Sequence, residues 1–174
     1  VQPEFVVSTA TACGVRNAYD VPGNLGVDRW LAVIAAHARE KRLTCIVSFG
    51  TAMTIDGVDA SGQHLGGVIV PGPDLMVNSL LQNTSEIASR ARNGKVEAAL
   101  FAGNTLGAIR QGAAHALAAL VERAVESMRT SARAEPKLLI GGGAATVVEG
   151  LIRIPHEIVH DLVLQGLARV SQER

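Results

Sequence analysis

An acid and a base stand side by side early in the chain, where Asp28 precedes Arg29 and follows Gly26 by two residues. The segment after them has the spacing of an amphipathic helix, so the pair lies at a helix entrance. A carboxylate in this place is favoured by the helix dipole and by capping geometry. An isolated Gly-x-Asp-Arg is therefore most simply a helix first turn, and a chemical role needs support from the rest of the chain.

A second group of residues could bind phosphate. The stretch SFGTAMTID, residues 48–56, is a buried strand that turns into a hairpin at Gly50, with Thr51 and Thr54 close by. A glycine there lets a phosphate approach the backbone, and a threonine hydroxyl with free N–H groups can bind its oxygens. A β-turn followed by strand threonines explains the same residues and is the simpler interpretation on composition alone.

Other candidate motifs are weaker. The turn at Gly141, Gly142 and Gly143 follows a predicted strand but lacks the spacing of a dinucleotide-binding GxGxxG. Thr105 lies at a predicted helix start, where capping is the commonest role of a hydroxyl. The histidines are scattered without metal-ligand spacing, and each is interpreted as structural or solvated. HExxH, Walker A and GxSxG motifs are absent, so no metal site is predicted.

The elements that must position these residues alternate between strand and helix. Apolar spacing predicts helices over residues 27–42, 75–82, 105–128 and 146–151, and from residue 162. Short apolar runs predict strands at residues 5–9, 43–49, 137–140 and 157–159, with an antiparallel hairpin over residues 52–58 and 64–70. Residues 89–95 and 129–136 are predicted surface loops. The chain is an α/β protein with some antiparallel pairing, and residues 1–174 form one unit.

Composition excludes several classes of protein. Sixteen basic residues balance sixteen acidic ones without a basic run, which argues against a nucleic-acid partner. Apolar runs are too short to cross a membrane and the first residues do not form a signal peptide, so we expect a cytoplasmic protein without membrane contact. Cys13 and Cys45 lack a metal-binding or CxxC pattern, and we expect reduced structural thiols.

The motifs taken together are a more specific signal than any one of them. The stretches AYDVPGNLGVDRW, FGTAMTIDGVDASGQHLGGVIVPG, GNT, GGGAA and DLVLQGL resemble, in order and spacing, those of the type III pantothenate kinases, which include the Bvg accessory factor homologues. This resemblance implies the actin-like ATPase superfamily, with ribonuclease-H-like lobes, a mixed sheet flanked by helices, and a homodimer. It further implies the ATP- and Mg²⁺-dependent phosphorylation of pantothenate to 4'-phosphopantothenate, which opens coenzyme A biosynthesis.

The resemblance also assigns roles to single residues. Asp28 matches the general base that takes the proton of the pantothenate hydroxyl. Arg29 and the backbone of Gly26 and Val27 match the substrate site, and an arginine fork suits a carboxylate. The remaining matches are Tyr19 as a substrate contact, Thr51 as a nucleotide contact, and Thr105 as a substrate contact from across the dimer interface.

The chain departs from the family pattern in two places. Ser48 stands where the family often has an aspartate that binds a monovalent cation, K⁺ or NH₄⁺, so we expect little dependence on that cation. No counterpart of the N-terminal DxGN phosphate loop occurs in these 174 residues, and we expect that segment to act in cis or in trans.

Two functions of different class therefore stay open from the sequence. One is a kinase completed by the phosphate-loop segment, and the other is a non-catalytic regulatory or binding protein on the same scaffold. The presence of Tyr19, Gly26, Asp28, Arg29 and Thr105 favours the kinase, since a scaffold freed from catalysis has no chemical need for that set. A dinucleotide-dependent oxidoreductase is disfavoured, because the glycine-rich turn and its acidic ribose anchor are missing.

Overall fold

A mixed five-stranded sheet forms the centre of the protein. The computed structural model describes residues 5–83 and 99–173, and the strands of its main sheet run in the order β5, β4, β3, β6, β7. Their bounds are β3 Thr44–Phe49, β4 Ala52–Val58, β5 His64–Pro71, β6 Lys137–Gly141 and β7 Glu157–Ile158. The strands β3, β4 and β5 pair antiparallel, whereas β6 is parallel to both β3 and β7. The sheet therefore joins a meander to a parallel crossover.

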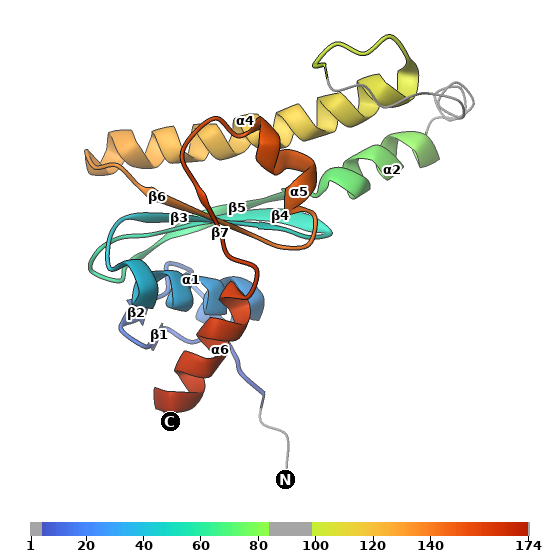
Figure 1. Cartoon of the computed structure of the whole chain (residues 1–174). Helices are drawn as coiled ribbons and strands as arrows, with labels where there is room; N and C mark the ends of the chain where they lie inside the picture. Colours follow the sequence, from blue (N-terminus) through green and yellow to red (C-terminus); the bar gives the residue numbers. More distant parts are fainter. Residues whose placement is uncertain (1–4, 84–98, 174) are drawn as a thin grey trace.

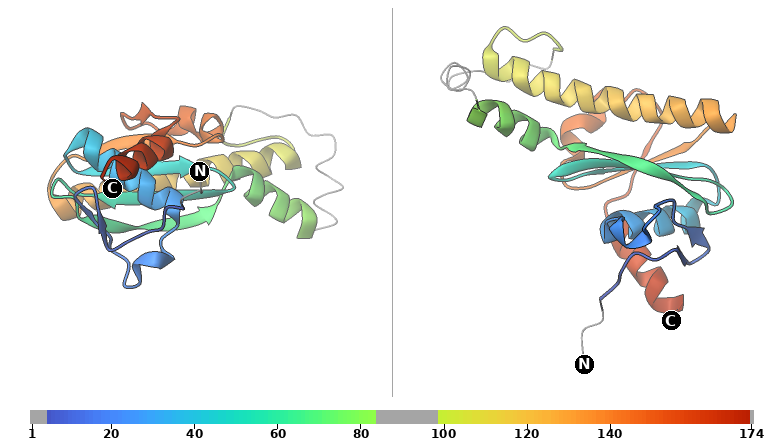
Figure 2. Two further views of the ribbon diagram at one scale, coloured as in Figure 1. Left: turned by 90° about the horizontal axis from the view of Figure 1, so that it is seen from below. Right: turned by 180° about the vertical axis from the view of Figure 1, so that it is seen from behind.

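Helices cover both faces of this sheet (Figure 1). Helices α1 (Val27–Glu40) and α6 (Leu162–Glu173) pack together on one face. The other face carries α2 (Pro73–Asn83), α4 (Thr105–Ala132) and α5 (Ala145–Val148). The view from behind shows the same three layers, and in the view from below α1 and α6 lie in front of the sheet (Figure 2). The predicted α/β architecture with a mixed sheet flanked by helices is confirmed.

Helix α1 follows from its sequence. Its apolar residues recur every three to four positions, and Trp30 and Ile34 are fully buried against the sheet. Asp28 occupies its first turn, where a negative charge complements the helix dipole. The helix ends at Lys41, whose left-handed backbone closes the last turn with an N–H···O bond to His37. The predicted helix over residues 27–42 is confirmed to within two residues.

Strand alternation divides the core into two apolar clusters. Cys45, Val47 and Phe49 of β3 point toward α4, whereas Ile46 packs with α1. The same alternation in β4 sends Met53 toward α4, and it sends the even-numbered residues of both strands toward α1. Those even-numbered positions include the polar residues Ser48, Thr54 and Asp56.

The first described residues differ from the prediction. Residues 5–9 form no strand, because the β-branched run has no neighbouring strand to pair with in the described structure. Pairing begins instead at a short hairpin of β1 (Thr11–Ala12) and β2 (Val15–Arg16). Both turn residues, Cys13 and Gly14, have positive φ, as a tight two-residue hairpin turn requires.

The two predicted loops have different outcomes. The predicted loop over residues 129–136 is wrong at its start, since α4 continues to Ala132 and ends at Arg133 in the left-handed region. Polar residues on the exposed side of a helix do not interrupt it, because only its buried stripe must be apolar. The predicted loop over residues 89–95 lies outside the described residues.

Candidate functional site

A buried ion pair links α1 to the sheet beneath it. Arg29 donates from Nε to Asp56 Oδ2 at 2.8 Å and from Nη2 to Asp56 Oδ1 at 2.6 Å. The two side chains are only 5% and 4% exposed. Burial by itself would lower the pKa of Arg29, but the hydrogen bonds and charge of Asp56 outweigh it and raise that pKa. The guanidinium is therefore a fixed positive charge at the edge of the core.

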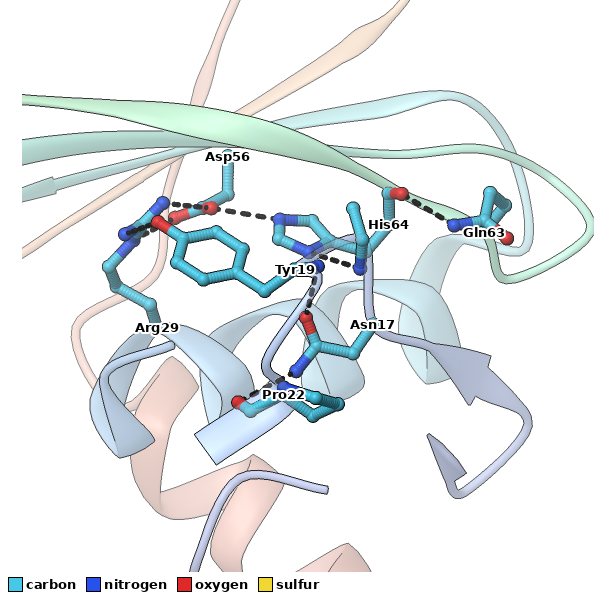
Figure 3. Close-up of polar contacts among 8 residues, drawn as sticks. Asn17, Tyr19, Pro22, Arg29, Asp56, Gln63 and His64 are labelled. Carbon is cyan, nitrogen blue, oxygen red and sulfur yellow. Dashed lines mark hydrogen bonds and ion pairs between the residues drawn. The ribbon is translucent and has the colours of Figure 1, made fainter. Parts of the chain in front are cut away.

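Tyr19 is attached to the same guanidinium. Arg29 Nη1 donates to the Tyr19 hydroxyl at 2.8 Å, and the guanidinium carbon lies 5.6 Å from the centre of the ring (Figure 3). Asn17 holds the loop in place, because its Oδ1 accepts the Tyr19 N–H and its Nδ2 donates to the Pro22 carbonyl. Tyr19 and Arg29, two residues predicted to contact substrate, are thus brought together.

His64 contacts Asp56, the backbone of Ala18 and the ring of Tyr19. Its Nε2 lies 2.9 Å from Asp56 Oδ1, and its Nδ1 lies 3.4 Å from the backbone N–H of Ala18. Because Nδ1 faces a donor, the arrangement assigns the proton to Nε2, which donates to the carboxylate. The imidazole also stacks on Tyr19, with ring centres 6.3 Å apart and planes 14° from parallel. His64 is fully buried, so it acts inside the protein.

Gly67 makes room for this network. It pairs with Asp56 across β4 and β5. A Cβ at Gly67 would lie closer than van der Waals contact to Arg29 Nη2, Asp56 Oδ1 and the Ile55 carbonyl. Glycine is therefore required at this position of β5, where the Arg29–Asp56 ion pair lies against the backbone.

Asp28 lies on the solvent side of the same helix turn. It is exposed, as are its neighbours Gly26 and Val27, whereas Arg29 points inward. A Cβ built on Gly26 would lie 2.8 Å from Asp28 Oδ1, so the carboxylate folds back over the glycine. The structure thus places an exposed carboxylate one residue from the buried Arg29.

The predicted phosphate-binding turn lies at the end of β3. Thr51 is exposed, and its carbonyl accepts the N–H of Gly72 at 2.8 Å. The glycine turn after β6 approaches closely from the parallel neighbour, since a Cβ on Gly142 would overlap the Phe49 backbone. Two glycine turns therefore meet where parallel strands end, which is the usual place for ligands in α/β sheets.

Ser48 lies at the end of the same strand. It is half-buried, pairs with Thr54 and Gly141, and points to the α1 face by strand alternation. No group of three or more His, Cys, Asp or Glu side chains within residues 5–83 and 99–173 is arranged to hold a metal ion. A magnesium ion at this chain would enter with the nucleotide, because in kinases the substrate phosphates bind magnesium together with only one or two protein carboxylates.

Thr105 lies apart from the other site residues. It begins α4, on the face of the sheet opposite α1 (Figure 1). The interpretation of Thr105 as a helix cap is wrong, because Asn104 is the cap and its side chain accepts the Gly107 N–H at 2.8 Å. Asn104 has the better capping geometry, since its oxygen precedes the first helical residue. The Thr105 hydroxyl is not needed for capping.

A pocket of about 570 Å³ lies on this second face, between α2, α4 and α5. It is separate from the ion-pair network, and most of its lining is apolar. Its polar lining consists of Asp74, Asn78, Arg110, Gln111 and Thr146.

Asp56 and His64 were not predicted as site residues. Asp56 had a usable signal, because a carboxylate in the otherwise uncharged strand AMTIDGV must be paired when buried. The partner could not be identified, since Arg29 is 27 residues away in sequence. His64 carried no signal beyond its position in the hairpin.

The described helices include none that is long and apolar enough to span a bilayer.

The fold has relatives among solved structures. A conserved Baf family protein of Campylobacter jejuni superposes with a TM-score of 0.62 at 23% identity, covering 92% of this chain and 69% of that one. An archaeal actin homologue superposes with a TM-score of 0.50 at 10% identity, covering 86% of this chain and 54% of the homologue. The chain thus has the fold of the actin-like ATPases.

Sequence comparison is more specific. The family model for type III pantothenate kinase matches residues 1–127. The type III pantothenate kinase of Aromatoleum aromaticum is 40% identical over 98% of this chain and 68% of its own length. That of Nitrosococcus oceani is 38% identical over 99% of this chain and 66% of its own length. The chain belongs to the type III pantothenate kinase family and spans about two thirds of the length of these relatives.

Proposed function

We propose that the complete protein, including any residues that precede Val1, phosphorylates pantothenate with ATP to give 4'-phosphopantothenate and ADP. This reaction would take place in the cytoplasm and open coenzyme A biosynthesis. The observation that carries the proposal is the juxtaposition on α1. In a member of this family, an exposed Asp28 adjoins a buried Arg29 that is bonded to Tyr19.

Asp28 is proposed as the general base. Its carboxylate accepts the proton of the pantothenate hydroxyl as the hydroxyl oxygen forms its bond to the γ-phosphorus and the bond to ADP breaks. The carboxylate has open access to solvent and is held at a helix N-terminus. Placement at this turn gives the base a fixed position relative to substrate bound over Gly26 and Val27.

Tyr19 and Arg29 are proposed to orient the substrate. Arginine has five N–H donors, and three of them already bond to Asp56 and Tyr19. The Tyr19 oxygen accepts from Arg29, so its own proton is left for another acceptor. One phenol donor and the remaining guanidinium donors suit the carboxylate or amide oxygens of pantothenate.

The nucleotide is proposed to bind at the end of β3. The turn at Gly50 and Thr51 and the facing turn at Gly142 bring backbone close together without intervening side chains. In such turns backbone N–H groups and hydroxyls donate hydrogen bonds to phosphate oxygens. Magnesium bound to the phosphates would neutralise charge on the transferred group.

A homodimer is proposed to complete the substrate site. Thr105 and Asp28 stand on opposite faces of one sheet, so both can contact one substrate only if Thr105 comes from a second copy. Mixing an Asp28→Asn protein with a Thr105→Ala protein tests this arrangement. Shared sites would restore a quarter to half of the activity, whereas sites built from one chain would stay inactive in the mixture.

The direct test of the function is a kinase assay on the complete protein. Pantothenate, ATP and Mg²⁺ should yield phosphopantothenate, detected by mass spectrometry, together with ADP in a coupled assay. Tight ATP binding without any product would instead favour the non-catalytic regulatory or binding protein.

The monovalent cation is a separate prediction. If Ser48 replaces a carboxylate ligand, activity should change less than about twofold between sodium and potassium buffers, because a neutral hydroxyl binds these ions weakly. Ser48→Asp should introduce or strengthen activation by K⁺ or NH₄⁺, and Thr54→Asp on the paired strand is the control. Strong potassium activation of the wild type would contradict this prediction.

A further inference from the structure

The network around Tyr19 contains two buried residues to which the proposed function gives no contact with the substrate. Asp56 and His64 are 3% and 1% exposed, and they lie on β4 and β5, which face the loop that carries Tyr19 (Figure 3). Asp56 accepts three hydrogen bonds, two from Arg29 and one from His64. Both residues would therefore affect the substrate only through Arg29 and Tyr19.

We propose that Asp56 and His64 are positioning residues that fix Arg29 and Tyr19 in the geometry needed to bind pantothenate. The inference rests on the proposed function, because Tyr19 and Arg29 are substrate contacts only if the protein binds pantothenate. It adds two residues to the site, each with a separate geometric task.

Asp56 fixes the rotation of the guanidinium. A carboxylate that accepts from both Nε and Nη2 matches the planar fork of arginine and holds its plane in one orientation. That orientation directs Nη1 at the Tyr19 oxygen. Since guanidinium has no acceptor, the phenol must accept, and its proton is directed away from Arg29. Asp56 thereby determines which way the Tyr19 donor points.

His64 fixes the loop. Its Nδ1 accepts from the Ala18 N–H, and its ring stacks on Tyr19. Its Nε2 donates to the same Asp56 oxygen that Arg29 Nη2 uses. The imidazole of His64 therefore links the Tyr19 ring and the Ala18 backbone to the Arg29–Asp56 ion pair.

The first test measures steady-state kinetics of Asp56→Asn in the complete protein. The asparagine keeps the size of the side chain, but its NH₂ group faces a guanidinium donor and leaves the fork free to rotate. The KM for pantothenate should rise at least about tenfold, while the KM for ATP stays within twofold. The matched control is His37→Gln, which removes another buried side chain from the α1 side of the sheet. It should leave both KM values within twofold.

The second test changes His64 and keeps the Arg29–Asp56 ion pair. It is needed because Asp56→Asn leaves the buried charge of Arg29 without its carboxylate, which could prevent folding. His64→Leu removes both ring nitrogens, whereas His64→Gln can still donate an N–H toward Asp56. His64→Leu should raise the KM for pantothenate about tenfold, and His64→Gln should recover part of that loss. A merely space-filling histidine would give the opposite order, with leucine the better replacement.

A readout independent of activity follows from composition. Tyr19 and Trp30 are the only tyrosine and the only tryptophan in the 174 residues. With ¹³C-labelled tyrosine, the signal lost in Tyr19→Phe reports this side chain, and fluorescence of the buried Trp30 reports the fold. In Asp56→Asn and His64→Leu the Tyr19 signal should shift or broaden while Trp30 emission stays native. It should not move in His37→Gln.

The outcomes separate the two proposals. If the wild type neither binds nor phosphorylates pantothenate, the proposed function fails, whereas the tyrosine signal still tests the network. An active wild type with an unmoved Tyr19 signal in both variants would overturn the positioning role. So would equal rises in the KM values for pantothenate and ATP.

Discussion

The two faces of the central sheet differ in what they bury. On the α4 face the core cluster consists of apolar side chains such as Val47, Phe49 and Leu117. On the α1 face a similar apolar cluster surrounds the charged side chains Arg29 and Asp56 and the imidazole of His64. Both faces use the same strands, and strand alternation separates the two environments.

This difference indicates that the α4 face mainly stabilises the fold, whereas the α1 face also holds the side chains of the candidate site. Burial of apolar area stabilises the fold without directional demands. A buried ion pair contributes little net stability, but removal of one partner costs about 3–5 kcal/mol. The α1 face therefore retains charges for their geometry, and mutations on the two faces should have separable effects.

The largest expected effect is on the α4 face. Leu117→Ala removes a side chain that is 2% exposed in this cluster. It should lower the free energy of unfolding by about 3 kcal/mol, from lost burial and a residual cavity. Urea denaturation measures the loss, and kcat/KM for pantothenate should stay within twofold. Leu164→Ala, at an exposed position of α6, is the control and should change stability by less than about 0.5 kcal/mol.

The second effect concerns catalysis on the α1 face. Asp28→Asn should lower kcat for pantothenate phosphorylation at least about a hundredfold, or about 2.7 kcal/mol in barrier height, because the amide cannot accept the proton. The free energy of unfolding should fall by no more than about 1 kcal/mol, because this exposed side chain stabilises the fold only through its charge in the first turn of α1. Asp20→Asn, a change in the nearby loop, is the control for altered surface charge. Turnover within a few-fold of wild type would contradict the assignment of the base.

The third effect tests the close approach at Gly67. Gly67→Ala should destabilise the fold by about 1–3 kcal/mol, because its methyl group overlaps Arg29 and Asp56. It should also raise the KM for pantothenate. Gly112→Ala on α4 is the matched control, since a Cβ there meets no atom within 4 Å. Helix propensity predicts that this control stabilises the protein by about 0.5–1 kcal/mol. Equal effects of the two substitutions would remove the distinction between the faces.

The smallest effect is a pH dependence on the α1 face. Burial lowers the pKa of His37 below the ordinary 6.5, and the charge of Lys41 lowers it further. Stability from this group is full above pH 6.5 and falls as the pH drops toward the folded-state pKa, because only the unfolded chain takes up the proton. The loss cannot exceed about 1.4 kcal/mol per pH unit. Denaturation at pH 7.5 and 5.5 should show a smaller difference in His37→Gln than in wild type. Leu164→Ala, at an exposed position of α6, changes no titratable group and should leave that difference unchanged.

Much of the fold was predictable because helix and strand periodicities are local. The helix over residues 27–40, the buried strand after it, the hairpin and the long helix from Thr105 all follow from apolar spacing and turn residues. The failure at residues 5–9 has a physical cause. A β-branched run becomes a strand only when a neighbouring strand offers hydrogen bonds, and composition does not show whether one is present.

The features of the candidate site also fall into those that the sequence predicts and those that only the structure shows. The sequence by itself determined the fold family, the acid at the start of α1 and the glycine turn at the end of β3, since each depends on residues close together in the chain. Only the tertiary structure decided that Arg29 pairs with Asp56, that His64 lies behind Tyr19, and that Thr105 stands on the other face. Those relations depend on strand register and on which face of the sheet each helix covers. Both are set by packing between distant segments, because a shift of one residue in register would turn Asp56 to the apolar face.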